Sequence, residues 1–116
     1  MTINNALASV AVKDIKAAVQ WYGKVLGRPA DLTPTPELAE WKFAGGGGLQ
    51  VYALPERAGS CSCTLTVSDI DLEATRLEKL GVATGAKMGE KIGEKSKVFM
   101  VKDPDGNSIA FAQASK

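Results

Sequence analysis

A pattern that occurs twice in the chain limits the possible folds more than any other feature of the sequence. The stretch Val12-Lys13-Asp14-Ile15 returns 55 residues later as Val67-Ser68-Asp69-Ile70. In both places a short apolar run precedes an aspartate that can cap a helix, and apolar residues at helical spacing follow. The helical pattern ends at Leu26-Gly27 and again at Leu80-Gly81, where glycine favours a helix stop. An internal repeat of this length predicts two copies of one structural unit.

Each half of the chain predicts a strand, a helix and about three further strands, which is a βαβββ module. In the first half we expect a helix over 15–26, with strands over 7–12, 30–33, 38–44 and 49–53. Pro34 and Pro36 should end the weak strand at 30–33. The second half predicts a strand over 61–67, a helix over 70–80, a short strand over 82–86, and a mobile loop or irregular hairpin over 87–97. We therefore expect one domain, 1–116, that contains modules 5–54 and 61–114 and a linker, 55–60.

The stretch Asp103-Pro104-Asp105-Gly106-Asn107 predicts the turn of a β-hairpin. Apolar runs rich in strand-forming residues flank it on both sides. Pro104 presets the backbone for the second position of a tight turn, and Gly106 or Asn107 can adopt a positive φ. This hairpin completes the second module.

Composition and charge exclude several classes of function. The 116 residues include 14 Lys and Arg and 13 Asp and Glu, which gives a net charge of +1. Charges that are scattered and balanced provide no basic patch for nucleic acid or for an anionic membrane surface. No apolar run reaches the length of a membrane span, and the first residues lack the layout of a signal peptide. We expect a cytoplasmic protein with neither a nucleic-acid nor a membrane partner.

Histidine is absent, which removes the commonest general base and the commonest metal ligand. Cys61 and Cys63 are the two thiols, and strand geometry places them on one face. A redox or metal pair is one interpretation, and two small core residues are the other. No further Cys or His can complete a metal site, so the core interpretation is favoured.

The glycine run Gly45–Gly48 invites comparison with a phosphate-binding loop. Such loops lie between a strand and a helix and are followed by Lys and Ser or Thr. Here a strand-like stretch, Leu49-Gln50-Val51, follows the run. The run is therefore interpreted as a hairpin turn.

Three motifs carry a family likeness, namely Val12-x-Asp14, Trp21-Tyr22-x-x-Val25-Leu26-Gly27 and Asp103-Pro104-Asp105-Gly106-Asn107-x-Ile109. Together they resemble the vicinal oxygen chelate superfamily, which includes glyoxalase I, extradiol dioxygenases, fosfomycin-resistance enzymes and bleomycin-resistance proteins. The likeness extends from about residue 7 to residue 113. It implies an α+β fold in which two tandem βαβββ modules form a cupped mixed sheet with helices on the outside. It also implies a homodimer with paired cups.

In the metal enzymes of that superfamily, His, Gln or Glu side chains on four strands hold a divalent ion inside the cup. The resemblance assigns these four positions to Leu7, Gln50, Ser62 and Ala110. Gln50 alone could be a ligand, and a neutral amide by itself does not hold a divalent ion. We expect no metal and no other cofactor.

Strand alternation places small and hydroxyl-bearing side chains on the cavity face, while larger apolar side chains occupy the opposite face. Neutral hydrogen-bonding groups around a concave surface are typical of a ligand site. Aromatic rings could stack on a planar ligand, although the core could equally contain the aromatic residues of the third strand. The expected ligand-binding residues are Ser9, Trp41, Gln50, Tyr52, Ser62, Thr64, Thr66 and Ser108.

The first functional hypothesis is a metal-free protein that binds a small molecule in a neutral polar cup. An alternative is a metal-independent lyase or isomerase that uses Tyr52, or Glu90 or Glu94 from the 87–97 loop. The sequence contains no convincing acid–base pair for it, and no catalytic residue is assigned. A third interpretation is an interaction module whose sheet face contacts a partner or a second copy of the chain.

Overall fold

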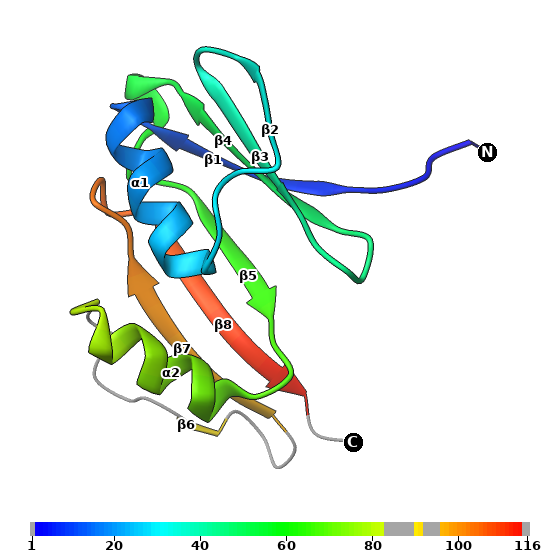
Figure 1. Cartoon of the computed structure of the whole chain (residues 1–116), viewed down its shortest axis with the longest axis vertical. Helices are drawn as coiled ribbons and strands as arrows, with labels where there is room; N and C mark the ends of the chain where they lie inside the picture. The colour runs from blue at the N-terminus through cyan, green and yellow to red at the C-terminus, as the bar shows by residue number, and fades with distance from the viewer. Residues whose placement is uncertain (1, 83–89, 92–95, 115–116) are drawn as a thin grey trace.

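The computed structural model describes residues 2–82, 90–91 and 96–114. Two βαβββ modules follow each other, as the repeat predicts (Figure 1). The first module consists of β1 (Leu7–Val12), α1 (Ile15–Leu26), β2 (Leu32–Thr35), β3 (Leu38–Lys42) and β4 (Gly48–Ala53). A short 3-10 helix, η1 (Pro55–Arg57), leads to the second, which consists of β5 (Ser62–Thr66), α2 (Ile70–Lys79), β6 (Glu90–Lys91), β7 (Ser96–Lys102) and β8 (Ser108–Ala114).

Each module forms a mixed four-stranded sheet, with the strand orders β1-β4-β3-β2 and β5-β8-β7-β6. The first and last strands of each module are parallel, because a helix connects the first strand to the rest, whereas the remaining pairs are antiparallel. In Figure 1 the first sheet occupies the upper half of the view and the second sheet the lower half. The expected α+β class of two tandem βαβββ modules is confirmed.

Both helices begin at the aspartates that the repeat singles out. The Asp14 carboxylate accepts hydrogen bonds from the backbone N–H groups of Lys16 and Ala17, and that of Asp69 accepts one from Leu72. α1 ends where Gly27 adopts a positive φ of 83°, a conformation that glycine tolerates best. The repeated sequence pattern is therefore a repeated helix N-cap.

One face of each sheet packs beneath the helices and forms the core. Every second residue of the central strands points to that face and is fully or almost fully buried. These residues include Val10, Trp41 and Val51 in the first sheet and Phe99, Ile109 and Phe111 in the second. The Phe99 and Phe111 rings stack with their centroids 5.0 Å apart. One continuous apolar cluster joins the two modules.

The short strands depart from the prediction in detail. β2 lies over Leu32–Thr35 and includes Pro34, which the sequence pattern treats as a breaker. It is an edge strand, so the missing N–H of proline costs no ladder bond on its open side. Residues 83–86 of the strand expected over 82–86 lie outside the described residues. Within 87–97, the described residues of β6 and β7 pair antiparallel as two arms of a hairpin, and Glu94 lies outside the described residues.

The two sheets meet where the end of β1 approaches the start of β5. Here side chains, and not a neighbouring strand, form the hydrogen bonds of the Ala11 backbone N–H and carbonyl groups. Its N–H donates to the Cys61 Sγ at 3.4 Å, and its carbonyl oxygen accepts from the Asn107 Nδ2 at 2.8 Å. The described strands accordingly form two sheets joined at a corner, and the two sheets do not share a continuous ladder.

Neither helix of the described residues has the length and the apolar character needed to cross a membrane.

Candidate functional site

On the first sheet, the face turned away from the core carries a row of hydrogen-bonded polar side chains. The Ser9 hydroxyl donates to the Gln50 Oε1 at 3.0 Å, and the Gln50 Nε2 donates to the Glu40 Oε2 at 2.9 Å. Register places these residues side by side, because Ser9 pairs with Gln50 across β1 and β4, and Gln50 pairs with Glu40 across β4 and β3. These contacts fix the orientation of the amide and point its nitrogen toward the carboxylate.

Glu40 is the member of this row that sequence analysis missed. It is half-buried and lies between Ala39 and Trp41, which are buried on the opposite face. Strand alternation within β3 would have placed it on the face of Gln50, once Trp41 was assigned to the core. A glutamate in a short strand usually faces solvent, so the sequence pattern alone did not single out Glu40 as a candidate.

The corresponding face of the second sheet carries hydroxyl groups and the Lys102 ammonium group. Ser62 lies opposite Ser108 in the β5–β8 register, and Thr64 lies opposite Ala110. The Lys102 ammonium group donates a hydrogen bond of 2.8 Å to the Ser108 Oγ. We call the two faces together, with Ser9, Glu40, Gln50, Tyr52, Ser62, Lys102 and Ser108, the polar sheet faces.

Trp41, which the sequence predicts to contact a ligand, lies in the core and not on the polar sheet faces. It pairs with Leu49, a core residue, and its side chain is fully buried. Its indole N–H donates to the carbonyl oxygen of Arg28 at 3.0 Å. A large aromatic ring at this position fills the space between β3 and α1, where its ring lies 6.2 Å from that of Tyr22.

The four positions at which the superfamily's enzymes hold a metal ion offer a poor donor set in this chain. They are occupied by two aliphatic side chains, Leu7 and Ala110, one hydroxyl, Ser62, and one amide, Gln50. Hard and borderline divalent ions need carboxylates, imidazoles or thiolates. Glu40 adds one carboxylate beside Gln50, but one of its oxygens already accepts from the amide nitrogen. No group of three potential ligands among His, Cys, Asp and Glu occurs in the described residues. The residues present do not fit a divalent ion.

A buried polar cluster lies at the corner between the modules. The Asn107 Oδ1 accepts from the backbone N–H groups of Gly59 and Cys61 at 2.8 and 2.9 Å, and its Nδ2 donates to the Asp103 Oδ2 at 2.8 Å. The Tyr22 hydroxyl donates to the same Asp103 oxygen at 2.7 Å. The predicted hairpin turn thus links β8, the connection between the modules, and α1.

Burial shifts the titration of two groups near this cluster. Desolvation, and then the hydrogen bond to Asp103, raises the pKa of Tyr22 far above its usual range. Desolvation is also the main cause that raises the pKa of the Cys63 thiol to about 11. Both groups stay protonated near neutral pH, which is the behaviour of structural residues rather than of a general base or a thiolate nucleophile.

A cleft with a volume of about 640 Å³ lies between the two modules. The predicted residues Thr64 and Thr66 line it, and Ser9, Gln50, Tyr52, Ser62 and Ser108 do not. Arg76 also lines it, but its guanidinium already donates to the carbonyl oxygens of Lys24 and Val25 and forms an ion pair with Glu73 at 2.7 Å. The structure thus divides the predicted site between the open polar sheet faces and this cleft.

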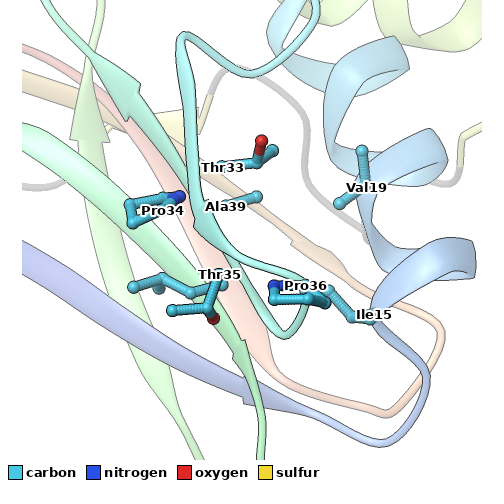
Figure 2. Close-up of a pocket in the computed structure, with 8 residues that line it drawn as sticks. Ile15, Val19, Thr33, Pro34, Thr35, Pro36 and Ala39 are labelled. Carbon is cyan, nitrogen blue, oxygen red and sulfur yellow. The ribbon is translucent and has the colours of Figure 1, made fainter.

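A smaller cleft of about 420 Å³ lies between α1 and the hairpin of β2 and β3. Figure 2 shows Ile15 and Val19 of the helix opposite the segment from Thr33 to Pro36. Its lining is mostly aliphatic, and the hydroxyls of Thr33 and Thr35 are the polar side-chain groups among the described lining residues. It offers apolar contact and little to fix the orientation of a ligand.

Solved structures with this fold include proteins with a described function. A glyoxalase/bleomycin resistance protein from Catenulispora acidiphila DSM 44928 is 32% identical, with a TM-score of 0.86 over 97% of this chain and 99% of that one. TnmS3, an antibiotic binding protein from Streptomyces sp. CB03234, is 26% identical, with a TM-score of 0.79 over 99% of both chains. A glyoxalase/bleomycin resistance protein from the same strain is 26% identical, with a TM-score of 0.73 over 92% of this chain and 97% of that one.

No curated protein matches the chain in sequence. The family model of the Glyoxalase/Bleomycin resistance protein/Dioxygenase superfamily matches residues 3–111, which is almost the whole length. The order of the elements and the resemblance of the three motifs agree with this match. The chain belongs to the Glyoxalase/Bleomycin resistance protein/Dioxygenase superfamily.

Proposed function

We propose that this protein binds a small organic molecule on its polar sheet faces, without a metal ion and without chemical turnover. The observation that carries the proposal is the ordered row of Ser9, Gln50 and Glu40 on an open sheet face. A polar row of this kind contributes little to folding on a solvated surface, whereas it presents oriented donors and acceptors to a ligand. The likeness to an antibiotic binding protein over the whole chain supports the same class of function.

The chemistry of the row indicates how a ligand would be held. Gln50 retains one amide N–H, because its other contacts are with Ser9 and Glu40. Within the described part of the chain the second carboxylate oxygen of Glu40 accepts no hydrogen bond, so it can accept one from a ligand hydroxyl or amine. On the second sheet, Lys102 and Ser108 supply donors. We expect a ligand with both donor and acceptor groups around an apolar body.

The polar sheet faces are open in a single chain, and we propose that a second copy covers them in a homodimer. Leu7 lies on the same face as Ser9 and is 39% exposed, although it is a large apolar residue. A symmetric pair of chains would bury such residues and turn an open face into an enclosed site. Light scattering should then give twice the chain mass of 12.2 kDa. Leu7→Lys should shift the protein toward the monomer, whereas a wild-type monomer would contradict this part of the proposal.

Equilibrium dialysis against a panel of aromatic antibiotics, with the bound compound detected by mass spectrometry, tests the proposed function. For any compound that binds, Gln50→Leu and Glu40→Gln should each weaken the affinity by roughly threefold to thirtyfold, since each removes a hydrogen bond. Gln20→Leu, at an exposed position on α1, is the matched control and should leave the affinity unchanged. Retention of no compound, or equal affinity in the Gln50 and Glu40 variants, would reject the proposal.

Elemental analysis of the purified protein tests the metal-free state. We expect far less than one divalent ion per chain, and ligand binding that survives treatment with a chelator. One divalent ion per chain in the wild type, absent from the Gln50→Leu variant, would contradict the metal-free state.

A further inference from the structure

A third cleft, of about 540 Å³, lies apart from the polar row on the first sheet. It is formed by the C-terminal half of α1, the end of α2 and the last residues of β7. The described residues that line it are Trp21, Lys24, Leu80, Gly81, Val82, Met100 and Lys102. Its volume falls within the range of small-molecule sites in proteins, which is roughly 300–1,000 Å³.

The walls of this cleft expose large apolar side chains to solvent. Leu80 is 40% exposed and Met100 is 46% exposed. Trp21 is half-buried, and one contact of its ring is edge-to-face with Tyr22, at a centroid distance of 4.8 Å. Covering exposed apolar surface with an apolar ligand is favourable, and a half-buried indole ring is suited to contact with a planar one.

The charged side chains among the described lining residues of this cleft are all positive. Lys24 lies in the last turn of α1 and Lys102 at the end of β7, and no acidic residue accompanies them in the lining. Within the described part of the chain neither lysine forms an ion pair, and Lys102 donates to the neutral hydroxyl of Ser108. The cleft between the modules differs, because Glu73 neutralises its arginine.

We propose that this cleft binds a small amphipathic anion. The planar apolar body of the ligand would contact Trp21, Leu80 and Met100, and one carboxylate or sulfonate would lie near Lys24 and Lys102. Two uncompensated ammonium groups attract an anion from solution, and the adjacent apolar surface retains it. The cleft shares Lys102 with the polar sheet faces, so Lys102→Gln affects both proposals, whereas Lys24→Gln tests the cleft alone and Gln50→Leu and Glu40→Gln test the row on the first sheet alone.

A pair of fluorescent probes separates the charge from the apolar contact. 1-Anilinonaphthalene-8-sulfonate carries a sulfonate, and N-phenyl-1-naphthylamine is the same ring system without it. Lys24→Gln and Lys102→Gln should each weaken binding of the sulfonate probe roughly two- to fivefold, as expected for an exposed charge pair. They should leave binding of the neutral probe unchanged. Lys16→Gln, an exposed lysine on α1 outside the cleft, is the matched control and should change neither affinity.

Nuclear magnetic resonance of the two tryptophan indoles locates the probe. The Trp21 indole signal, assigned by its loss in Trp21→Phe, should shift as the sulfonate probe is added. The Trp41 signal should stay in place, because that ring is fully buried and hydrogen-bonded to Arg28. Gln50→Leu should bind the probe as the wild type does, so failure here and failure of the proposed function are distinguishable.

Three results would overturn the inference. The first is no binding of the sulfonate probe to the folded protein, and the second is equal affinity for it in the wild type and in the Lys24→Gln, Lys102→Gln double variant. The third is a probe-induced shift that leaves the Trp21 indole unchanged. A purely structural role of Lys24 at the negative end of the α1 dipole would produce the second result.

Discussion

The hydroxyl group of Tyr22 lies 2.7 Å from the Oδ2 of Asp103, although 81 residues separate them in the sequence. Both residues are almost completely buried, and within the described residues the groups that donate to Asp103 are all uncharged. Its carboxylate instead accepts four hydrogen bonds, from Tyr22, from the Asn107 side chain and from the backbone N–H groups of Asp105 and Asn107. Complete hydrogen bonding is what allows a charged group to remain inside the protein.

Tyr22→Phe should lower the free energy of unfolding by about 1–3 kcal/mol, because it removes one donor from a buried carboxylate and leaves the ring packing unchanged. Urea unfolding followed by circular dichroism measures this. Tyr52→Phe, at a half-buried position with no hydrogen bond to Asp103, is the control and should cost less. Equal stability of Tyr22→Phe and the wild type would mean that the Tyr22–Asp103 contact does not stabilise the fold.

Stability should decline at alkaline pH more steeply in the wild type than in Tyr22→Phe. The pKa of Tyr22 is raised by burial, so the folded state keeps its phenolic proton above pH 10, where the unfolded chain releases it. The stabilising contribution is thus complete below about pH 10 and is lost as the pH rises further. Urea midpoints of both proteins, measured from pH 8 to pH 11, test this expected difference in slope. A Tyr22→Phe curve parallel to the wild-type curve would contradict it.

Asn107→Asp should destabilise the protein by more than about 3 kcal/mol at pH 8, since it places a second carboxylate 2.8 Å from that of Asp103 in a buried site. Repulsion raises the pKa of one of the two carboxyl groups, so the cost should shrink as the pH falls toward 4. Asn107→Ala loses the same hydrogen bonds without adding charge, and its cost should change little with pH. Thermal unfolding of both variants between pH 4 and pH 8 is the measurement, and matching pH profiles would argue against charge repulsion.

Gly59→Ala and Gly46→Ala form a matched pair, because both glycines have a positive φ, of 95° and 106°. A Cβ at position 59 would lie 2.7 Å from the carbonyl oxygen of Asp105, whereas one at position 46 would meet nothing within 4 Å. We expect Gly46→Ala to cost about 1–2 kcal/mol from the left-handed backbone alone. Gly59→Ala should cost about 1–3 kcal/mol more from the clash. Urea unfolding compares them, and equal costs would show that the turn moves aside freely.

The Cys63 thiol should react slowly with iodoacetamide in the folded protein. Burial raises its pKa to about 11, so little thiolate is present at pH 8. In a Cys61→Ser background, alkylation followed by mass spectrometry should be at least about tenfold slower in buffer than in urea at the same pH. The rate should keep rising up to about pH 11. Equal alkylation rates in buffer and in urea would contradict a raised pKa of the Cys63 thiol.

Local sequence patterns predicted the elements well because caps and alternation are local effects. Asp14 and Asp69 begin the helices as expected, and the boundaries of β1 and α1 agree with the prediction. Alternation also predicted that Ser9 and Gln50 each point away from the core. These features depend on residues a few positions apart, so one sequence is sufficient to find them.

The site residues that were misplaced or missed depend on contacts between distant segments. The burial of Trp41 follows from its pairing with Leu49 and from the position of α1, and neither can be derived from β3 alone. The hydrogen bond between Glu40 and Gln50 likewise depends on the neighbouring strand. Asp103 is a typical turn residue in local terms, and its burial against Tyr22 depends on how the two modules meet.

The two halves of the repeat are unequal in one respect that affects the whole molecule. The β3–β4 turn of the first module contains a run of glycines, whereas the β7–β8 turn of the second contains Asp103 and Asn107, which hold both modules together. A chain assembled from two copies of the first module would repeat the helices and strands but would lack the hydrogen bonds that Asp103 and Asn107 make to Tyr22 and Ala11. The symmetry of the repeat is therefore visible in the backbone, while the buried polar contacts between the modules depend on a turn that only the second half contains.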